Sequence, residues 1–292
     1  MRTEHVVPSL EAISRVVPSW ALVDGVRLGD RFNESLEKVA LPFGLQRLSF
    51  GEYFNKSLEM VSLPKQLMVL EFHGRYNQPL DKVALPRCLQ TLKFGPRSKF
   101  NRCMHKVALP SSLQRLVMVG LKFNHPLDKV ALPSGLLHLE LGGKYNQSIE
   151  KVALPSGLLH LELGGKFDKS MDKVVLPSGL QMLMFGSIFN KRMDNVALPS
   201  GLQILHFGDG FNQPIESVAL PIGLQQLRFG NSFNRSIETV ALPEGMISLS
   251  FGRGFREPLE KVALPNSLRS LSVRNECMQG VWFPSFCRVY LV

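Results

Sequence analysis

The sequence lacks the features of a secreted, disulfide-bonded or membrane-spanning protein. Its 292 residues include only four cysteines, none of them in a Cys-x-x-Cys pair, which argues against a disulfide framework or a zinc knuckle. The first twenty residues, MRTEHVVPSLEAISRVVPSW, lack the apolar run of a secretory signal, and no stretch approaches the roughly 20 apolar residues that cross a bilayer. We therefore expect a cytoplasmic or nuclear protein with reduced thiols and no membrane partner.

Acidic residues are fewer than basic ones, and the chain has no clear helical periodicity. The chain has 24 Asp and Glu against 34 Lys and Arg, a formal net charge of +10, which permits attraction to nucleic acid or another polyanion without establishing it. No window holds ten or more residues at helical period, and Pro and Gly recur evenly along the chain. The sequence therefore predicts short strands and tight turns in place of helices.

What the sequence has in abundance is a repeat. Leu-Pro occurs eleven times, with a spacing of 22 residues except for 24 and 23 around Pro110, and Val stands three residues before each of these prolines. An aromatic residue precedes each copy, from Phe32 to Phe255, and Asn follows it in nine of the eleven. A fixed period of this length is typical of a solenoid, in which each repeat stacks only on its neighbours.

Two apolar segments in each unit have the spacing L-x-x-L-x-L. In the first copy they are Leu36-x-x-Val39-x-Leu41 and Leu45-x-x-Leu48-x-Phe50. We predict a mainly β fold with two short strands per repeat, each stacked as a parallel ladder about 4.8 Å from its equivalent in the next repeat.

The columns of this stack predict its interior. The eleven aromatic residues should form a buried spine, and each following Asn should hydrogen-bond backbone groups of the adjacent repeat. The pattern decays at both ends, where atypical segments cover the open core of a solenoid. We expect an N-terminal cap with a half repeat at residues 1–30 that includes Trp20, a solenoid at residues 31–275, and a C-terminal cap at residues 276–292.

The repeated unit resembles a known family. Phe-Asn-x-Ser/Pro-Leu/Ile followed by Leu-Pro-x-x-Leu-x-x-Leu-x-Phe-Gly is similar to the FNIP repeat, a relative of the leucine-rich repeat, and Phe211-Asn212-Gln213-Pro214-Ile215 comes close to the form that gives the repeat its name. The resemblance covers about residues 22–275. It implies an interaction scaffold and supplies no catalytic residue, and we expect no enzyme activity and no cofactor.

The residues that change from repeat to repeat lie between the inward positions of the second segment. Side chains alternate along a strand, so these positions should form an outward face that is free to specialise. We predict that this face binds another protein at the following residues: His138, Glu140, His160, Glu162, Met182, Met184, Ile204 and His206.

This face has two competing interpretations. The duplicated His-x-Glu of residues 138–140 and 160–162, with His206 nearby, has ligands suited to zinc, but a flat ladder does not converge its side chains and copying of one repeat explains the duplication. We therefore expect no metal. The apolar strip of Met182, Met184 and Ile204 is typical of adaptable protein-binding surfaces, although a turn or a second copy of the chain covering it would also explain it.

The alternative function is polyanion or RNA binding. Two columns of basic residues run along the repeats, but an acidic column precedes the lysines and neutralises much of their charge as solvated ion pairs. The acid is missing in the segment from Pro96 to Lys106, which includes an insertion that should protrude as a loop. Candidate phosphate contacts there are Arg97, Lys99, Arg102 and Lys106.

Overall fold

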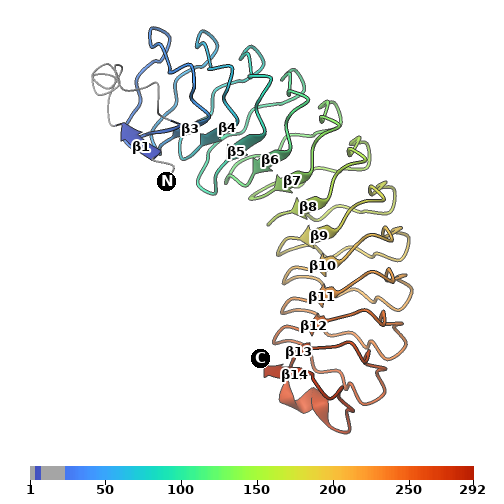
Figure 1. Ribbon diagram of the computed structural model, residues 1–292. Coiled ribbons are helices and arrows are strands. Elements are labelled where there is room, and N and C mark those ends of the chain that lie inside the picture. Colours follow the sequence, from blue (N-terminus) through green and yellow to red (C-terminus); the bar gives the residue numbers. More distant parts are fainter. Residues whose placement is uncertain (1–3, 8–23) are drawn as a thin grey trace. The chain divides into compact units, whose positions relative to one another are not determined.

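The structure is a computed structural model that describes residues 4–7 and 24–292. It divides into two compact units, Met1–Tyr145 and Asn146–Val292, and each unit is a stack of parallel strands with one strand per repeat (Figure 1). The predicted mainly β solenoid of roughly 22-residue repeats is therefore confirmed. Most of the predicted N-terminal cap, including Trp20, lies outside the described residues.

In the described part of the first unit, seven strands pair in sequence order, each parallel to its neighbour. Their bounds are β1 (Glu4–Val7), β2 (Gly25–Leu28), β3 (Arg47–Phe50), β4 (Val69–Phe72), β5 (Thr91–Phe94), β6 (Arg115–Met118) and β7 (His138–Leu141).

The second unit repeats this arrangement with seven further parallel strands. They are β8 (His160–Leu163), β9 (Met182–Phe185), β10 (Ile204–His206), β11 (Gln226–Arg228), β12 (Ser248–Ser250), β13 (Ser270–Val273) and β14 (Arg288–Leu291). A 3-10 helix, η2 (Asn275–Met278), precedes β14. Within the part of the chain that is described, no helix has the length and apolar character needed to cross a membrane.

The strands form where apolar residues alternate with variable ones. In β4, Leu70 and Phe72 are fully buried while Val69 and Glu71 remain partly exposed, and β9 repeats the pattern. The one-residue alternation places the Leu and the Phe of each Leu-x-Phe on the core side. The second predicted segment of each repeat is therefore the strand.

The first predicted segment is a turn, which corrects the expectation of two strands per repeat. The backbone N–H of Val39 donates to the carbonyl of Leu36 at 3.0 Å, and that of Leu45 donates to Pro42 at 3.1 Å. Both bonds recur in all eleven repeats. The spacing Leu-x-x-Val closes a four-residue turn as readily as it begins a strand, and the proline that follows has no N–H to give to a ladder.

The aromatic spine is confirmed within each unit. Neighbouring rings stack with centroids 5.9 to 6.3 Å apart in the first unit and 6.0 to 6.1 Å apart in the second. The Phe of the strand adds a second column, as in Phe185 of β9, whose ring lies 4.0 Å from that of Phe189. Offset stacks of this kind are a favoured arrangement of aromatic rings and add to the stability that their burial provides.

The asparagines form the predicted ladder between repeats. The backbone N–H of Asn55 donates to the side-chain oxygen of Asn33 at 2.9 Å, one repeat earlier. Asp168 replaces Asn without breaking the ladder, because its carboxylate accepts from the backbone of Asn190 at 3.0 Å. The same donation is made by the backbones of Asn77, Asn101, Asn124, Asp168, Asn212, Asn234 and Arg256.

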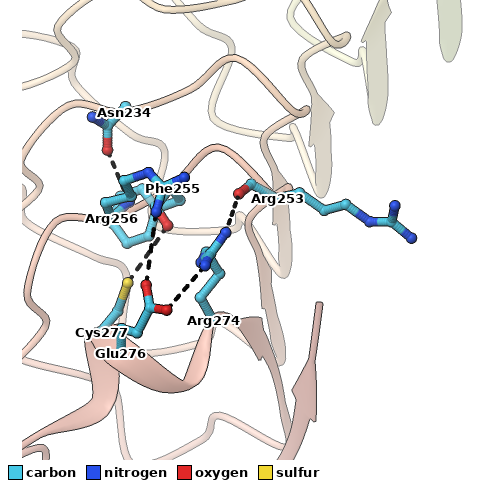
Figure 2. A network of polar contacts seen from close by, with 7 residues as sticks. All are labelled: Asn234, Arg253, Phe255, Arg256, Arg274, Glu276 and Cys277. Atoms are coloured by element: carbon cyan, nitrogen blue, oxygen red, sulfur yellow. Dashed lines mark hydrogen bonds and ion pairs between the residues drawn. The ribbon is translucent and has the colours of Figure 1, made fainter.

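The ladder ends against η2 (Figure 2). Arg256 donates its backbone N–H to Asn234 at 2.8 Å, but its own side chain lies 3.8 Å from the carboxylate of Glu276. Glu276 also accepts from Arg274 at 3.0 Å, and the thiol of Cys277 donates to the carbonyl of Phe255 at 3.6 Å. Side chains of η2 thus contact the last residues of the spine and the ladder.

Candidate functional site

The variable face of the second unit brings together most of the predicted partner-binding residues. In the strand register Met182 lies between His160 and Ile204, and Met184 lies between Glu162 and His206. The six side chains therefore form two parallel rows across β8, β9 and β10, and all six are partly exposed. We call Met182, Met184 and Ile204 the methionine patch.

Charged groups border the methionine patch on the side of β11. Arg228 is exposed and lies in register beside His206. Burial lowers the pKa of His206, and the nearby Arg228 guanidinium lowers it further. At neutral pH the patch therefore has an uncharged imidazole and a permanent cation beside its apolar side chains, which suits an apolar surface that carries a carboxylate.

His138 and Glu140 lie in the first unit, on β7. Glu140 accepts an ion pair from Arg115 of β6 at 3.5 Å. Between β5 and β7 the outward position of β6 is held by Val117, which is only 2% exposed. Lys93 and Glu140 stand on either side of it in register.

Within residues 4–7 and 24–292, no three His, Cys, Asp or Glu side chains are grouped so that they could hold a metal ion. This agrees with the geometry of a flat ladder, which keeps equivalent side chains parallel and apart.

Two of the four candidate phosphate contacts line the same pocket. Arg102 and Lys106 line a pocket of about 380 Å³ together with Cys103, His105 and His125. Arg102 is held there by a 2.8 Å hydrogen bond to the carbonyl of Asn77.

The other two contacts, Arg97 and Lys99, follow β5 and do not line this pocket. The predicted neutralisation of the lysine column is seen elsewhere, for example in Lys82 with Glu59 at 3.0 Å and Lys261 with Glu238 at 3.6 Å.

Sequence reasoning missed one feature of this pocket. The Sγ atom of Cys103 lies 2.8 Å from Nδ1 of His105. The signal is a double departure from the repeat, because Cys103 occupies the position that is Ser in five other repeats, and His105 occupies a position that is acidic in the other ten. The prediction treated the two residues separately, one as an isolated thiol and the other as part of a basic loop.

Comparison with known proteins identifies a family with the same repeat. The FNIP Repeat family matches residues 32–75, 54–97, 76–119, 100–144, 123–166, 145–188, 189–232 and 233–273. No sequence among curated proteins matches the chain.

Two solved structures share the fold. CroV588, reported as a novel circular LRR protein structure, superposes with a TM-score of 0.72 at 29% identity over 93% of this chain and 47% of its own, so this chain spans about half its length. An internalin (inlF) from Listeria monocytogenes str. 4b F2365 superposes with a TM-score of 0.61 at 12% identity, over 92% of this chain and 80% of its own, which shows the fold alone.

The family matches together span residues 32–188 and 189–273, far more than half of the chain, and they coincide with the turns, the aromatic spine and the asparagine ladder described above. The chain belongs to the FNIP repeat family and has a leucine-rich-repeat-like solenoid structure, a fold typical of binding scaffolds.

Proposed function

We propose that the chain is a non-catalytic scaffold that binds another protein through the methionine patch. The observation that carries this proposal is the placement of Met182, Met184 and Ile204 in adjacent register on the outward side of β9 and β10, partly exposed. Water contact at such a patch is unfavourable, and flexible thioether side chains adapt to varied apolar partners.

The surroundings of the patch define the chemistry of the partner. Arg228 supplies a permanent positive charge on one side, and His206 becomes positive when the pH falls. We infer a partner segment that places apolar side chains on the methionine patch and an Asp or Glu side chain beside Arg228. His160 and Glu162 extend the surface along β8, whereas His138 and Glu140 belong to the first unit and stay a prediction.

Affinity purification with a matched pair of variants tests this proposal. The first variant carries Met182→Glu, Met184→Glu and Ile204→Glu. The control carries Val175→Glu, Ile188→Glu and Ile222→Glu, which add the same charge at exposed apolar residues of the same unit outside the strands. Proteins retained at moderate salt by the parent are identified by mass spectrometry, purified, and titrated against all three forms.

We expect the patch variant to bind the purified partner at least about tenfold more weakly than the parent, because full burial of a Met or Ile side chain contributes about 1.5–3 kcal/mol. The control variant should bind as the parent does. Binding as tight as that of the parent by both variants, with circular dichroism showing both to be folded, would show that the partner uses another surface.

Polyanion binding is the second candidate, favoured by the pocket that Arg102 and Lys106 share. Counterion release makes phosphate binding steeply dependent on salt. Binding of single-stranded RNA that weakens at least about tenfold between 50 and 200 mM salt, and that is lost in Arg102→Gln with Lys106→Gln, would support this function. Loss of RNA binding in the methionine-patch variant would argue against the basic pocket as its site.

A further inference from the structure

In the fourth repeat a pair of reactive side chains replaces a Ser and an acidic residue that are paired in other repeats. In five other repeats the hydroxyl of a Ser accepts the backbone N–H of the acidic residue two positions later, as in Ser57 with Glu59 at 3.1 Å and Ser170 with Asp172 at 3.1 Å. In the fourth repeat the Ser position is Cys103 and the acidic position is His105. Both members of one turn therefore change together, from a capping pair to a thiol and an imidazole.

The two groups are in contact and open to solvent. Cys103 Sγ lies 2.8 Å from His105 Nδ1, and both residues are exposed. The thiolate, not the thiol, attacks electrophilic sulfur. An imidazole in hydrogen-bond contact can take the thiol proton as the attack occurs, which is the arrangement that activates a nucleophilic cysteine.

The pair lies in a pocket with a net positive lining. The pocket holds about 380 Å³ and is lined by Pro79, Asp81, Asn101, Arg102, Cys103, His105, Lys106 and His125. Arg102 and Lys106 bring two positive charges and Asp81 one negative charge. The 2.8 Å bond from Arg102 to Asn77 and the 3.1 Å contact from His125 to the carbonyl of Asn101 hold two of these side chains in place.

We propose that Cys103 is a site of reversible thiol modification that exchanges with small anionic disulfides of the glutathione disulfide class. The Cys103 proton passes to Nδ1 of His105, and Sγ attacks one sulfur of the disulfide. A new bond forms between Sγ and that sulfur while the original disulfide bond breaks, and the departing thiolate takes the proton from His105. Cys103 is oxidised and the small disulfide is reduced, so the step needs no other oxidant.

The charge of the lining selects the disulfide. Carboxylates of the incoming molecule meet Arg102 and Lys106, which raises the local concentration of an anionic reagent. The pocket admits a small molecule, and the exposed thiol leaves the mixed disulfide open to reduction by a free thiol, which makes the modification reversible.

The chain provides its own control thiol. Cys88 is exposed like Cys103, and it has the cationic neighbours Lys65 and Arg87 in a separate pocket. In the described part of the chain no imidazole lies in hydrogen-bond contact with it. A difference in reactivity between the two thiols therefore reports the His105 contact.

The experiment follows site-resolved modification of the reduced full chain by mass spectrometry. Glutathione disulfide, the neutral 2-hydroxyethyl disulfide and the cationic cystamine are compared at pH 7. We expect Cys103 to react at least about tenfold faster than Cys88 and to lose that advantage in His105→Gln, because general-base assistance commonly contributes a factor of a hundred or more. Arg102→Gln with Lys106→Gln should reduce the preference for glutathione disulfide over cystamine and leave the reaction with 2-hydroxyethyl disulfide unchanged.

Equal rates at Cys103 and Cys88 in the parent would overturn the proposal, as would an unchanged Cys103 rate in His105→Gln. A faster reaction with cystamine than with glutathione disulfide would also overturn it, because the anion preference would then be absent. The methionine-patch variant should react as the parent does, so failure here and failure of the proposed scaffold function are separate results.

Discussion

At the scale of the residue, the fold depends on the kind of side chain at two positions of each repeat, the aromatic position of the spine and the Asn position of the ladder. The spine accepts Phe or Tyr, and the ladder accepts Asn or Asp, because each position demands one physical property: a flat buried ring in the first case and a side-chain oxygen in the second. Substitutions that keep the property should be tolerated and those that remove it should not.

Tyr76 keeps the ring but buries a hydroxyl that has no hydrogen-bond partner within the described residues. Its burial raises the pKa of the phenol. An unsatisfied buried polar group costs about 1–3 kcal/mol, so Tyr76→Phe should raise the free energy of unfolding by about 1 kcal/mol in urea denaturation. Tyr290→Phe, at a half-exposed residue of β14, is the control and should change nothing.

The parent should also lose stability as the pH rises above about 10, the usual tyrosine pKa, since the unfolded chain releases the Tyr76 proton first. That loss should be smaller in Tyr76→Phe. A variant less stable than the parent at every pH would contradict the assignment of an unsatisfied hydroxyl.

The asparagine ladder makes a second prediction. Asn212 accepts the backbone N–H of Asn234 at 3.0 Å, and Asn212→Ala leaves that donor without its partner. We expect the free energy of unfolding to fall by about 1 kcal/mol or more. Asn212→Asp should retain most of the stability because Asp168 already fills an equivalent position with a carboxylate oxygen; equal losses in the two variants would show that the oxygen is not what matters.

At the scale of the element, the backbones of neighbouring repeats come into close contact after several of the strands. A Cβ atom at Gly208 would overlap the backbone of Gly186 and approach Ser187 Cα at 2.9 Å, whereas the nearest atom to a Cβ at Gly245 would be 3.7 Å away. The two glycines lie in the same unit, but only the first lies where two turns touch.

Gly208→Ala should therefore destabilise the protein by about 1–3 kcal/mol, because the clash is with backbone that cannot rotate away. Gly245→Ala should be nearly neutral. Thermal denaturation followed by circular dichroism measures both, and a neutral Gly208→Ala would contradict the close approach of the turns.

The strand β10 carries a pH dependence through His206. Burial and then Arg228 of β11 lower the pKa of this imidazole, and Met184 of β9 faces it without a charge. The unfolded chain therefore binds the proton first as the pH falls below about 6.5, so the stability that is present above that pH is lost progressively below it. The decrease in denaturation midpoint between pH 7.5 and 5.5 should be smaller in His206→Gln than in the parent.

At the scale of the whole molecule, the repeat period allowed the solenoid, the spine and the ladder to be predicted, because eleven copies repeat the same physical demands. The turn at Leu36-x-x-Val39 was not predicted, since that spacing fits a turn and a strand equally and only the proline favoured the turn. The burial of Val117 at an outward position was not predicted, because the strand pattern gives the direction of a side chain and not what covers it. The contact between Cys103 and His105 depends on rotamers that a pattern does not specify.

Part of the candidate site could also be predicted from the repeat, and part could not. The repeat predicted which positions face outward, and the structure places His160, Met182 and Ile204 in one row as expected. The division of the chain between Tyr145 and Asn146 falls inside a run of regular repeats. The composition does not change there, so the sequence did not predict the division. The partner-binding role of the face therefore stays a proposal that binding measurements decide.

The most direct test of the scaffold function is a calorimetric titration of the purified partner at several temperatures and at 50 and 200 mM salt. Burial of the methionine patch predicts a negative heat capacity change of binding that becomes smaller in the Met182→Glu, Met184→Glu, Ile204→Glu variant, with an affinity that changes little with salt. A heat capacity change near zero, together with an affinity that falls steeply with salt in parent and variant alike, would contradict apolar recognition by this face.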